Sequence, residues 1–191
     1  MPDDDLYIGP TVLAPGAPLG DGIGTRLAEK ILVPLAVAFL LVVMVFYVFF
    51  NRGRVDGPSM YPTLHNADMV LVTKGYDAPR RGDVIFTRTT ENGAPIELVK
   101  RVIGIPGDTV EVKRDVAYVN GVAEPARGQF VDPAVAGSFV PLVVPPGQLF
   151  VMGDNRPVSE DSRFIGTVPL AGVMGRVIAV YAPVNRIRFV H

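Results

Sequence analysis

The sequence predicts an all-β domain preceded by one apolar helix long enough to cross a membrane. Residues 31–50 carry no charge, and after them the chain alternates between short apolar segments and turn residues. No segment beyond residue 51 keeps a helical period over three turns. Many short strands of this kind are typical of coiled antiparallel sheets that form a sandwich or a partly closed barrel. We expect a disordered tail at 1–25, a transmembrane helix at 26–51 and the β domain at 52–191.

The N-terminal part divides into a polar tail and the apolar helix. Residues 1–25 are rich in Gly, Pro and Asp, which predicts disorder, and Thr25 is the candidate N-cap of the helix. At 1.5 Å per residue, the apolar run spans about 30 Å, the thickness of a bilayer's hydrocarbon core. The run is longer than a typical signal-peptide core and no small-x-small cleavage site follows it. We therefore interpret it as an anchor rather than as a removed signal or a buried core helix.

The charges that flank this helix leave its orientation open. Arg26 and Lys30 lie on one side of the apolar run, and Arg52 and Arg54 lie on the other. Because basic residues favour the cytoplasmic side, equal counts do not decide which end faces the cytoplasm.

The β domain is predicted from alternating apolar runs bounded by turns at 81–83, 91–94 and Asn120-Gly121. Residues 125–141 are interpreted as a loop because they are rich in Gly, Pro and Ala. Strands are expected at 68–73, 84–88, 96–103, 109–113, 116–119, 122–124, 148–152 and 173–181.

Composition excludes several functional classes. The chain has no cysteine, which rules out disulfides, a thiolate nucleophile and cysteine metal ligands. Its formal net charge of −1 lacks the basic excess of most nucleic-acid-binding domains. With His65 and His191 as the only histidines, a zinc site would need carboxylates for most of its ligands. We expect no metal, no cofactor and no nucleic-acid partner.

The segment Gly57-Pro-Ser-Met-Tyr-Pro-Thr-Leu64 is the first candidate for chemistry. Pro58 fixes its own φ and Pro62 biases Tyr61 towards extended conformations, so Ser59 lies on a stiff backbone. A hydroxyl held in this way suits a nucleophile, because its direction of attack is set before the substrate binds. The same residues also fit a proline-rich turn that links a helix to a domain.

The second candidate is Lys100, in the middle of an expected strand. Alternation places it on the same face as Ile96, Leu98 and Val102, with Arg101 on the opposite face. Burial on an apolar face lowers the pKa of a lysine, and a neutral amine is the general base that a serine nucleophile needs. Alternatively, the amine reaches the edge of the sheet and stays in water.

The third candidate is the polar segment Gly153-Asp-Asn-Arg-Pro-Val-Ser-Glu-Asp-Ser-Arg163, which lies between apolar strands. Polar groups so close to a core must pair with one another, which predicts a fixed hydrogen-bond network. A solvated loop, or a calcium site formed by Asp154, Glu160 and Asp161, also fits these residues.

Together the three segments resemble the conserved boxes of bacterial type I signal peptidases of the short, single-anchor type. Segments 59–64, 100–108 and 153–163 resemble the nucleophile, lysine and third boxes, and the resemblance covers roughly residues 52–181. It implies a membrane-anchored serine endopeptidase that removes signal peptides from exported preproteins after a small residue, at sites of the Ala-x-Ala type. The implied partners are preprotein signal peptides and the lipid bilayer. The implied location is a single pass through the cell membrane, with a cytoplasmic N-terminus and an extracytoplasmic domain.

The resemblance also implies roles for individual residues. Ser59 is the implied nucleophile, Lys100 the general base, and Ser159 the hydroxyl that orients the lysine amine. The implied supporting residues are Asp154 and Arg101, which form an ion pair, together with Asp161 and Arg163. The residues implied to line the pocket for small side chains at the substrate's −1 and −3 positions are Met60, Leu64 and Val99.

Two departures from the family pattern concern the oxyanion and the size of the domain. Some members carry a serine two residues before the nucleophile, which donates to the oxyanion, and this chain has Gly57 there. The backbone N–H of Ser59 is one expected donor, and the second donor is unknown. The short stretch between Lys100 and Gly153 lacks the large extra β domain of some members.

Two other functions, and one other choice of general base, fit parts of the sequence. A self-cleaving repressor of related fold uses the same dyad but needs a DNA-binding module where this chain has its apolar run. His65 is a second candidate for the general base. A catalytically inactive, membrane-tethered β module that binds secreted proteins is the alternative outside enzymes, and it needs neither Ser59 nor Lys100.

Overall fold

The structure of the protein is a computed structural model that describes residues 23–91, 93–125, 127–132 and 137–190. Most of the expected disordered tail, residues 1–22, lies outside the described residues. The chain divides into two compact units, residues 1–45 and 46–191, which are described separately below.

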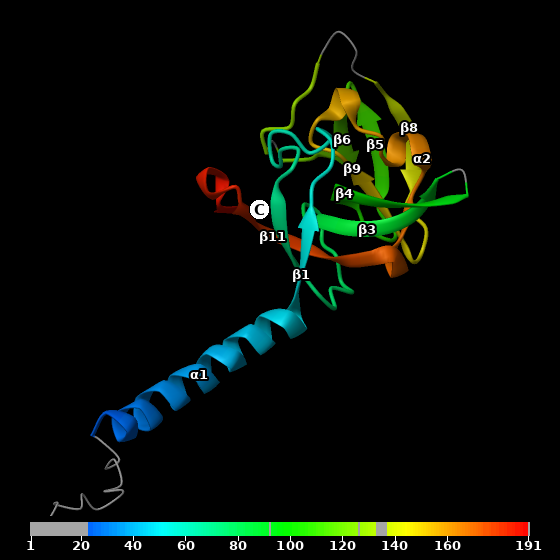
Figure 1. Cartoon of the computed structure of the whole chain (residues 1–191). Helices are drawn as coiled ribbons and strands as arrows, with labels where there is room; N and C mark the ends of the chain where they lie inside the picture. Colours follow the sequence, from blue (N-terminus) through cyan, green and yellow to red (C-terminus); the bar gives the residue numbers. More distant parts are fainter. Residues whose placement is uncertain (1–22, 92, 126, 133–136, 191) are drawn as a thin grey trace, which may run out of the picture. The chain divides into compact units, whose positions relative to one another are not determined.

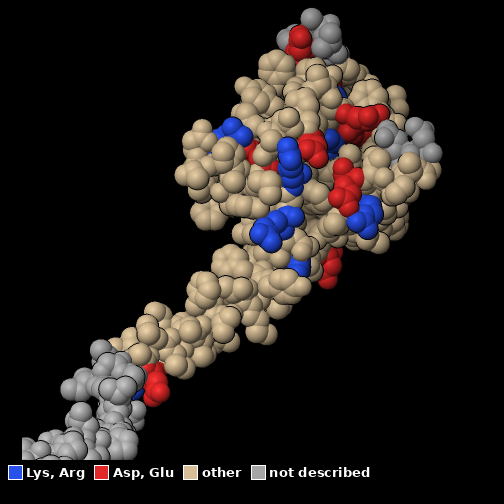
Figure 2. Space-filling model, viewed as in Figure 1, with Lys and Arg blue, Asp and Glu red and all other residues tan. Residues whose placement is uncertain are grey.

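Helix α1 (Ile23–Phe49) contains the apolar run (Figure 1). It begins two residues before Thr25, so Thr25 does not cap it. Its segment Ala28–Phe49 has a mean hydropathy of 3.0 and is long and apolar enough to cross a membrane. Figure 2 shows this segment without charged side chains along most of its visible surface. The helix ends at Phe49 instead of residue 51, because the following residues pair as a strand.

The larger sheet of the β domain is antiparallel and contains eight of the described strands (Figure 1). Its order is β1-β2-β11-β3-β4-β9-β10, with β12 paired to β11, and the described strands leave it open instead of closing it into a barrel. These strands are β1 (Phe50–Arg54), β2 (Met69–Thr73), β3 (Val84–Glu91), β4 (Ala94–Gly104), β9 (Gln148–Met152), β10 (Val168–Pro169), β11 (Val173–Ala182) and β12 (Arg188–Phe189).

A smaller four-stranded sheet has the order β7-β6-β5-β8. It consists of β5 (Thr109–Lys113), β6 (Val116–Val119), β7 (Val122–Ala123) and β8 (Phe139–Val143). The predicted hairpin of β5 and β6 is confirmed, with Val110 opposite Val119. The described helices after α1 are short, namely η1 (Arg156–Val158), α2 (Ser162–Ile165), η2 (Leu170–Gly172) and η3 (Val184–Arg186).

The predicted loop at 125–141 is wrong in its last part, and residues 126 and 133–136 lie outside the described residues. Phe139 to Pro141 belong to β8, which forms an edge of the smaller sheet. An edge strand tolerates Pro141 because the missing N–H faces away from the ladder. Proline therefore marked an edge strand here and not a loop.

The core is made of three clusters of buried side chains. Met60 and Leu64 belong to the first cluster and pack with Val70, Val72 and Val180 of β2 and β11. Each aliphatic side chain removed from water stabilises the fold by about 1.5–3 kcal/mol. The loop that carries Ser59 is thus anchored in the core and not left as a mobile connection.

Candidate active site

The loop after β1 turns Ser59 towards a cleft. The N–H of Tyr61 donates to the carbonyl of Pro58 (3.0 Å) and that of Leu64 donates to Met60 (2.8 Å), which winds the segment into tight turns. Met60 and Leu64 point into the core, with no exposed surface. Ser59 remains half-buried, and it lines the cleft.

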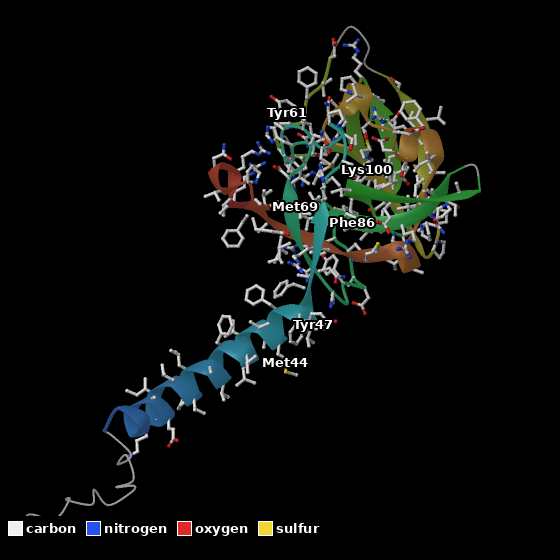
Figure 3. The ribbon with its side chains drawn as sticks, viewed as in Figure 1. Met44, Tyr47, Tyr61, Met69, Phe86 and Lys100 are labelled. Carbon is white, nitrogen blue, oxygen red and sulfur yellow. The ribbon has the colours of Figure 1, made fainter. Side chains whose placement is uncertain are left out.

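Lys100 reaches Ser59 from strand β4. Its Nζ donates a hydrogen bond of 2.8 Å to Ser59 Oγ, although the two residues lie 41 positions apart. Lys100 pairs with Ile85 across the sheet and is only 4% exposed, and Figure 3 shows it inside the β domain. The alternative in which the amine stays in water is therefore wrong.

The surroundings of Lys100 favour its neutral form. Burial lowers its pKa below the ordinary lysine value, because the charged amine loses its hydration. The negative charges of Asp161 and Glu160 oppose this shift, while Arg163 adds to it. Desolvation is the largest of these effects, so the pKa of Lys100 stays lowered.

Ser159 lies close to this pair but is not engaged with it. It is buried, and its Oγ has no hydrogen-bond partner within the described part of the chain. Its hydroxyl instead lies against Gly153, where an added Cβ would come within 2.2 Å of Oγ. The hydrogen bond from Ser159 to Lys100 that the resemblance implies is thus not formed in this structure.

Arg101 and Asp154 form a buried ion pair. Arg101 Nε and Nη2 donate to the two carboxylate oxygens of Asp154 at 2.8 and 2.6 Å, and both residues are almost fully buried. The hydroxyl of Thr63 also donates to Asp154. Because a buried charge without its partner costs about 3–5 kcal/mol, this pair holds the Ser59 loop, β4 and the polar loop in one arrangement.

Asp161 and Arg163 belong to a second buried network. Asp161 accepts from the N–H of Gly153 (3.0 Å) and from Arg163 Nε (2.9 Å). Arg163 also donates to the Asp115 carboxylate at 2.6 Å, and Arg156 donates to the Asp115 carbonyl at 2.6 Å. The network therefore ties the polar loop to the β5–β6 turn.

Asp115 and Arg156 are two further supporting residues that the sequence alone does not indicate. Arg156 is inside the third box, and its burial to 1% distinguishes it from a solvated arginine. Asp115 lies 48 positions from Arg163, and no sequence spacing rule links the two.

Ser59 and Lys100 open into a cleft of about 530 Å³. Val99 lines this cleft, as the resemblance implies, and so does Phe86, which pairs with Val99 across the sheet. Met60 and Leu64 do not line it. They lie wholly in the core, because the tight turn directs both side chains inward.

The backbone before Ser59 explains why residue 57 is glycine. Gly57 has φ +85°, a region that side-chain-bearing residues adopt only with strain. Its N–H donates to Asn66 Oδ1 (2.9 Å), so it is not available to an oxyanion. The Ser59 N–H donates to none of the described residues, which leaves one donor free at the site.

The alternative uses of His65 and of the carboxylates find no support in the geometry. The His65 ring lies edge-on to Tyr61 at 5.2 Å, and its Nδ1 is 4.0 Å from the Asp68 carboxylate. Asp154 and Asp161 bind arginines rather than facing a common centre. Within the described ranges, no group of three His, Asp or Glu residues is arranged to hold a metal.

Comparison with known proteins agrees with the resemblance. A family model described as signal peptidase, peptidase S26, matches residues 28–182. Signal peptidase I T of Bacillus subtilis (strain 168) is 37% identical over 168 residues, covering 81% of this chain and 85% of that protein. Signal peptidase I of Leptolyngbya laminosa is 34% identical over 180 residues, covering 90% of this chain and 83% of that protein. A crystal structure of a signal peptidase I from Enterococcus faecalis V583 is 36% identical and covers 52% of this chain and 96% of that chain, with a TM-score of 0.43.

These matches define the class first: the chain is a hydrolase, a serine-type endopeptidase. Within that class it belongs to the signal peptidase family, peptidase S26, and its relatives are type I signal peptidases. The family assignment drawn from the three sequence boxes is confirmed.

Proposed function

We propose that the protein removes signal peptides from exported preproteins with a Ser59–Lys100 dyad, cutting after a small residue at sites of the Ala-x-Ala type. The observation that carries this proposal is the 2.8 Å contact between the amine of a buried lysine and a serine hydroxyl at the wall of a cleft. A module that only binds secreted proteins does not need this pair.

The reaction proceeds in two halves. Neutral Lys100 takes the proton of Ser59 as Oγ attacks the carbonyl carbon, and the proton then passes from Lys100 to the leaving amine as the C–N bond breaks. In the second half, Lys100 takes a proton from water, whose oxygen attacks the acyl ester. The proton returns to Ser59 Oγ as the ester bond breaks, and the signal peptide departs with a free carboxyl end. No cofactor takes part.

The strands that border the cleft support an extended substrate. β9 pairs with β4 only from Arg101 onward, so residues 94–99 of β4 pair with β3 alone among the described strands. β1 pairs only with β2 within the same set and lines the other side of the cleft. A peptide that adds a strand along either free edge places its carbonyl next to Ser59.

The apolar helix supports membrane anchoring. We propose a single pass, with the N-terminus in the cytoplasm and the β domain outside it. Tethering confines the enzyme and its membrane-bound substrates to one plane, which raises their effective concentration.

The test of this function is cleavage of a preprotein by the full chain in detergent or vesicles. We expect cleavage after the −1 residue of an Ala-x-Ala site, because Val99 and Phe86 restrict the cleft. Replacement of either alanine by Phe is expected to lower kcat/KM by more than about tenfold, with N-terminal sequencing of the product as the readout. Equal cleavage of the Phe substrates, or no cleavage of any, would reject the proposal.

The lowered pKa of Lys100 predicts the pH dependence. Only the neutral amine accepts the proton of Ser59, so kcat/KM is expected to rise with pH and to level off above a midpoint below ~10.4, the free lysine value. Glu160 is exposed and its charge raises the pKa of Lys100, so Glu160→Gln is expected to move the midpoint to lower pH. A midpoint at the free lysine value, or a shift to higher pH in Glu160→Gln, would contradict the assignment of Lys100 as base.

A further inference from the structure

The side chain of Asn155 holds the peptide group that precedes the nucleophile. Its Nδ2 donates to the carbonyl of Pro58 at 3.1 Å, and its backbone N–H donates to the carbonyl of Ser59 at 3.0 Å. The carbonyl of Pro58 accepts a second hydrogen bond from the N–H of Tyr61 (3.0 Å). Asn155, 97 positions from Pro58, thus makes two hydrogen bonds to the backbone around Ser59. One holds the carbonyl before the Ser59 N–H, and the other holds the carbonyl after the Ser59 Cα.

The Pro58 carbonyl and the Ser59 N–H belong to one peptide unit. That unit is planar and trans, so its C=O and N–H point in opposite directions. A donor that holds the carbonyl oxygen therefore sets the direction of the N–H on the other side. Hydrogen bonding at the carbonyl also polarises the amide and makes its N–H a stronger donor.

The N–H that is directed in this way is the one left free at the site. It donates to none of the described residues, and Gly57, two residues earlier, has its own N–H engaged by Asn66. A free, fixed N–H beside the nucleophile is the group that stabilises negative charge on the oxygen of an attacked carbonyl.

We propose that Asn155 is a positioning residue for the oxyanion: by holding the Pro58 carbonyl, it aims the Ser59 N–H at the oxygen of the attacked carbonyl. This inference rests on the proposed peptidase function and deepens it. Asn155 does not touch the Lys100 amine through any hydrogen bond in the described structure, so its effect is separate from proton transfer.

The experiment compares Asn155→Ala and Asn155→Asp with wild type in the full chain. Both variants lose the donor, and Asn155→Asp keeps the shape of the side chain. Loss of an oxyanion donor costs about 10²–10³ in kcat; because Tyr61 still holds the Pro58 carbonyl, we expect a loss of about 10–100-fold. KM is expected to stay within about twofold in both variants, since the substrate cleft is untouched. The pH midpoint is expected to stay unchanged in Asn155→Ala, whereas the added carboxylate of Asn155→Asp is expected to raise it, as the charge of Glu160 does.

A pair of inhibitors separates this role from a structural one. A peptide aldehyde ending in alanine forms a tetrahedral adduct with Ser59 that carries the oxyanion, whereas the matching peptide alcohol does not. The affinity for the aldehyde is expected to fall by the same factor as kcat in both variants, and that for the alcohol is expected to stay constant.

Asn66→Ala is the control, because Asn66 also bonds the backbone before Ser59 but accepts from the N–H of Gly57, so its loss leaves the Pro58 carbonyl untouched. It is expected to change kcat by less than about threefold. Unchanged kcat in both Asn155 variants, retained aldehyde affinity, a shifted pH midpoint in Asn155→Ala, or an equal loss in Asn66→Ala would each overturn the proposal. An inactive wild type would instead overturn the peptidase function itself, so the two failures are distinguishable.

Discussion

Lys100→Met is expected to abolish preprotein cleavage, with kcat/KM lowered by at least about 10³-fold. Methionine fills nearly the same volume in the buried site but accepts no proton, so Ser59 keeps its hydroxyl proton and stays a weak nucleophile. Ser59→Ala is expected to lose at least as much activity. The measurement is single-turnover cleavage of an Ala-x-Ala preprotein by the purified full chain.

Folding of these variants is expected to survive. Lys100 is 4% exposed and its amine is desolvated, so an apolar replacement removes a cost of burial that offsets the loss of its hydrogen bond to Ser59. The unfolding midpoint of Lys100→Met is therefore expected to equal or exceed that of wild type. Lys113→Met, at an exposed lysine paired with Glu111, is the matched control and is expected to keep full activity. Near-normal turnover by Lys100→Met would reject the dyad.

Local sequence patterns predicted Ser59 and Lys100, because the rigid backbone of the one and the apolar face of the other depend on nearby residues alone. Alternation along one strand was enough to place Lys100 among apolar side chains and Arg101 on the opposite face. Two prolines were enough to mark the backbone of Ser59 as stiff. That the two side chains meet depends on the path of the chain between positions 59 and 100, and this required either the family resemblance or the structure.

Local patterns did not predict which side chains of the Ser59 loop point into the core and which line the cleft. The resemblance implies that Met60 and Leu64 line the substrate pocket, yet a tight turn places both in the core. Phe86 lines the cleft instead, and the signal for it was its position on a strand opposite Val99. Strand pairing is a tertiary property, so this residue was found only after the sheet order was known.

Strands with a local sequence signal were predicted correctly, whereas a strand that depends on tertiary pairing was not. The strands at 109–113, 116–119 and 148–152 carry their own apolar alternation and turn signals, and their predicted bounds are confirmed. β1 (Phe50–Arg54) lacks such a signal, because it has no apolar alternation, carries Arg52 and Arg54, and is mostly exposed. It becomes a strand by pairing with Met69–Thr73. Without that partner, the apolar run before it favours continued helix.

Gly153→Ala is expected to lower kcat by about 10²-fold, because at this glycine the polar loop packs directly against the backbone of Ser59. A Cβ at this position would come within 2.4 Å of the Ser59 carbonyl oxygen and within 2.2 Å of Ser159 Oγ. The hydroxyl can rotate away, but the Ser59 carbonyl is main chain and also accepts from Asn155. The methyl group therefore displaces the nucleophile by about 1 Å, and a misplacement of that size costs about 10²-fold in rate.

A second substitution identifies whether the contact with Ser59 or the contacts with Ser159 cause the loss. Ser159→Gly removes both side-chain contacts, with Oγ at 2.2 Å and with Cβ at 2.6 Å, and leaves the contact with Ser59. Gly153→Ala combined with Ser159→Gly is therefore expected to stay as slow as Gly153→Ala. Full recovery in the double variant, measured as kcat on the same preprotein, would place the clash at Ser159 instead. Gly137→Ala is the control, since among the described residues its added Cβ meets only Asp115, at an ordinary 3.6 Å. Retained activity there with a large loss at Gly153 ties the effect to the Ser59 backbone and not to glycine replacement as such.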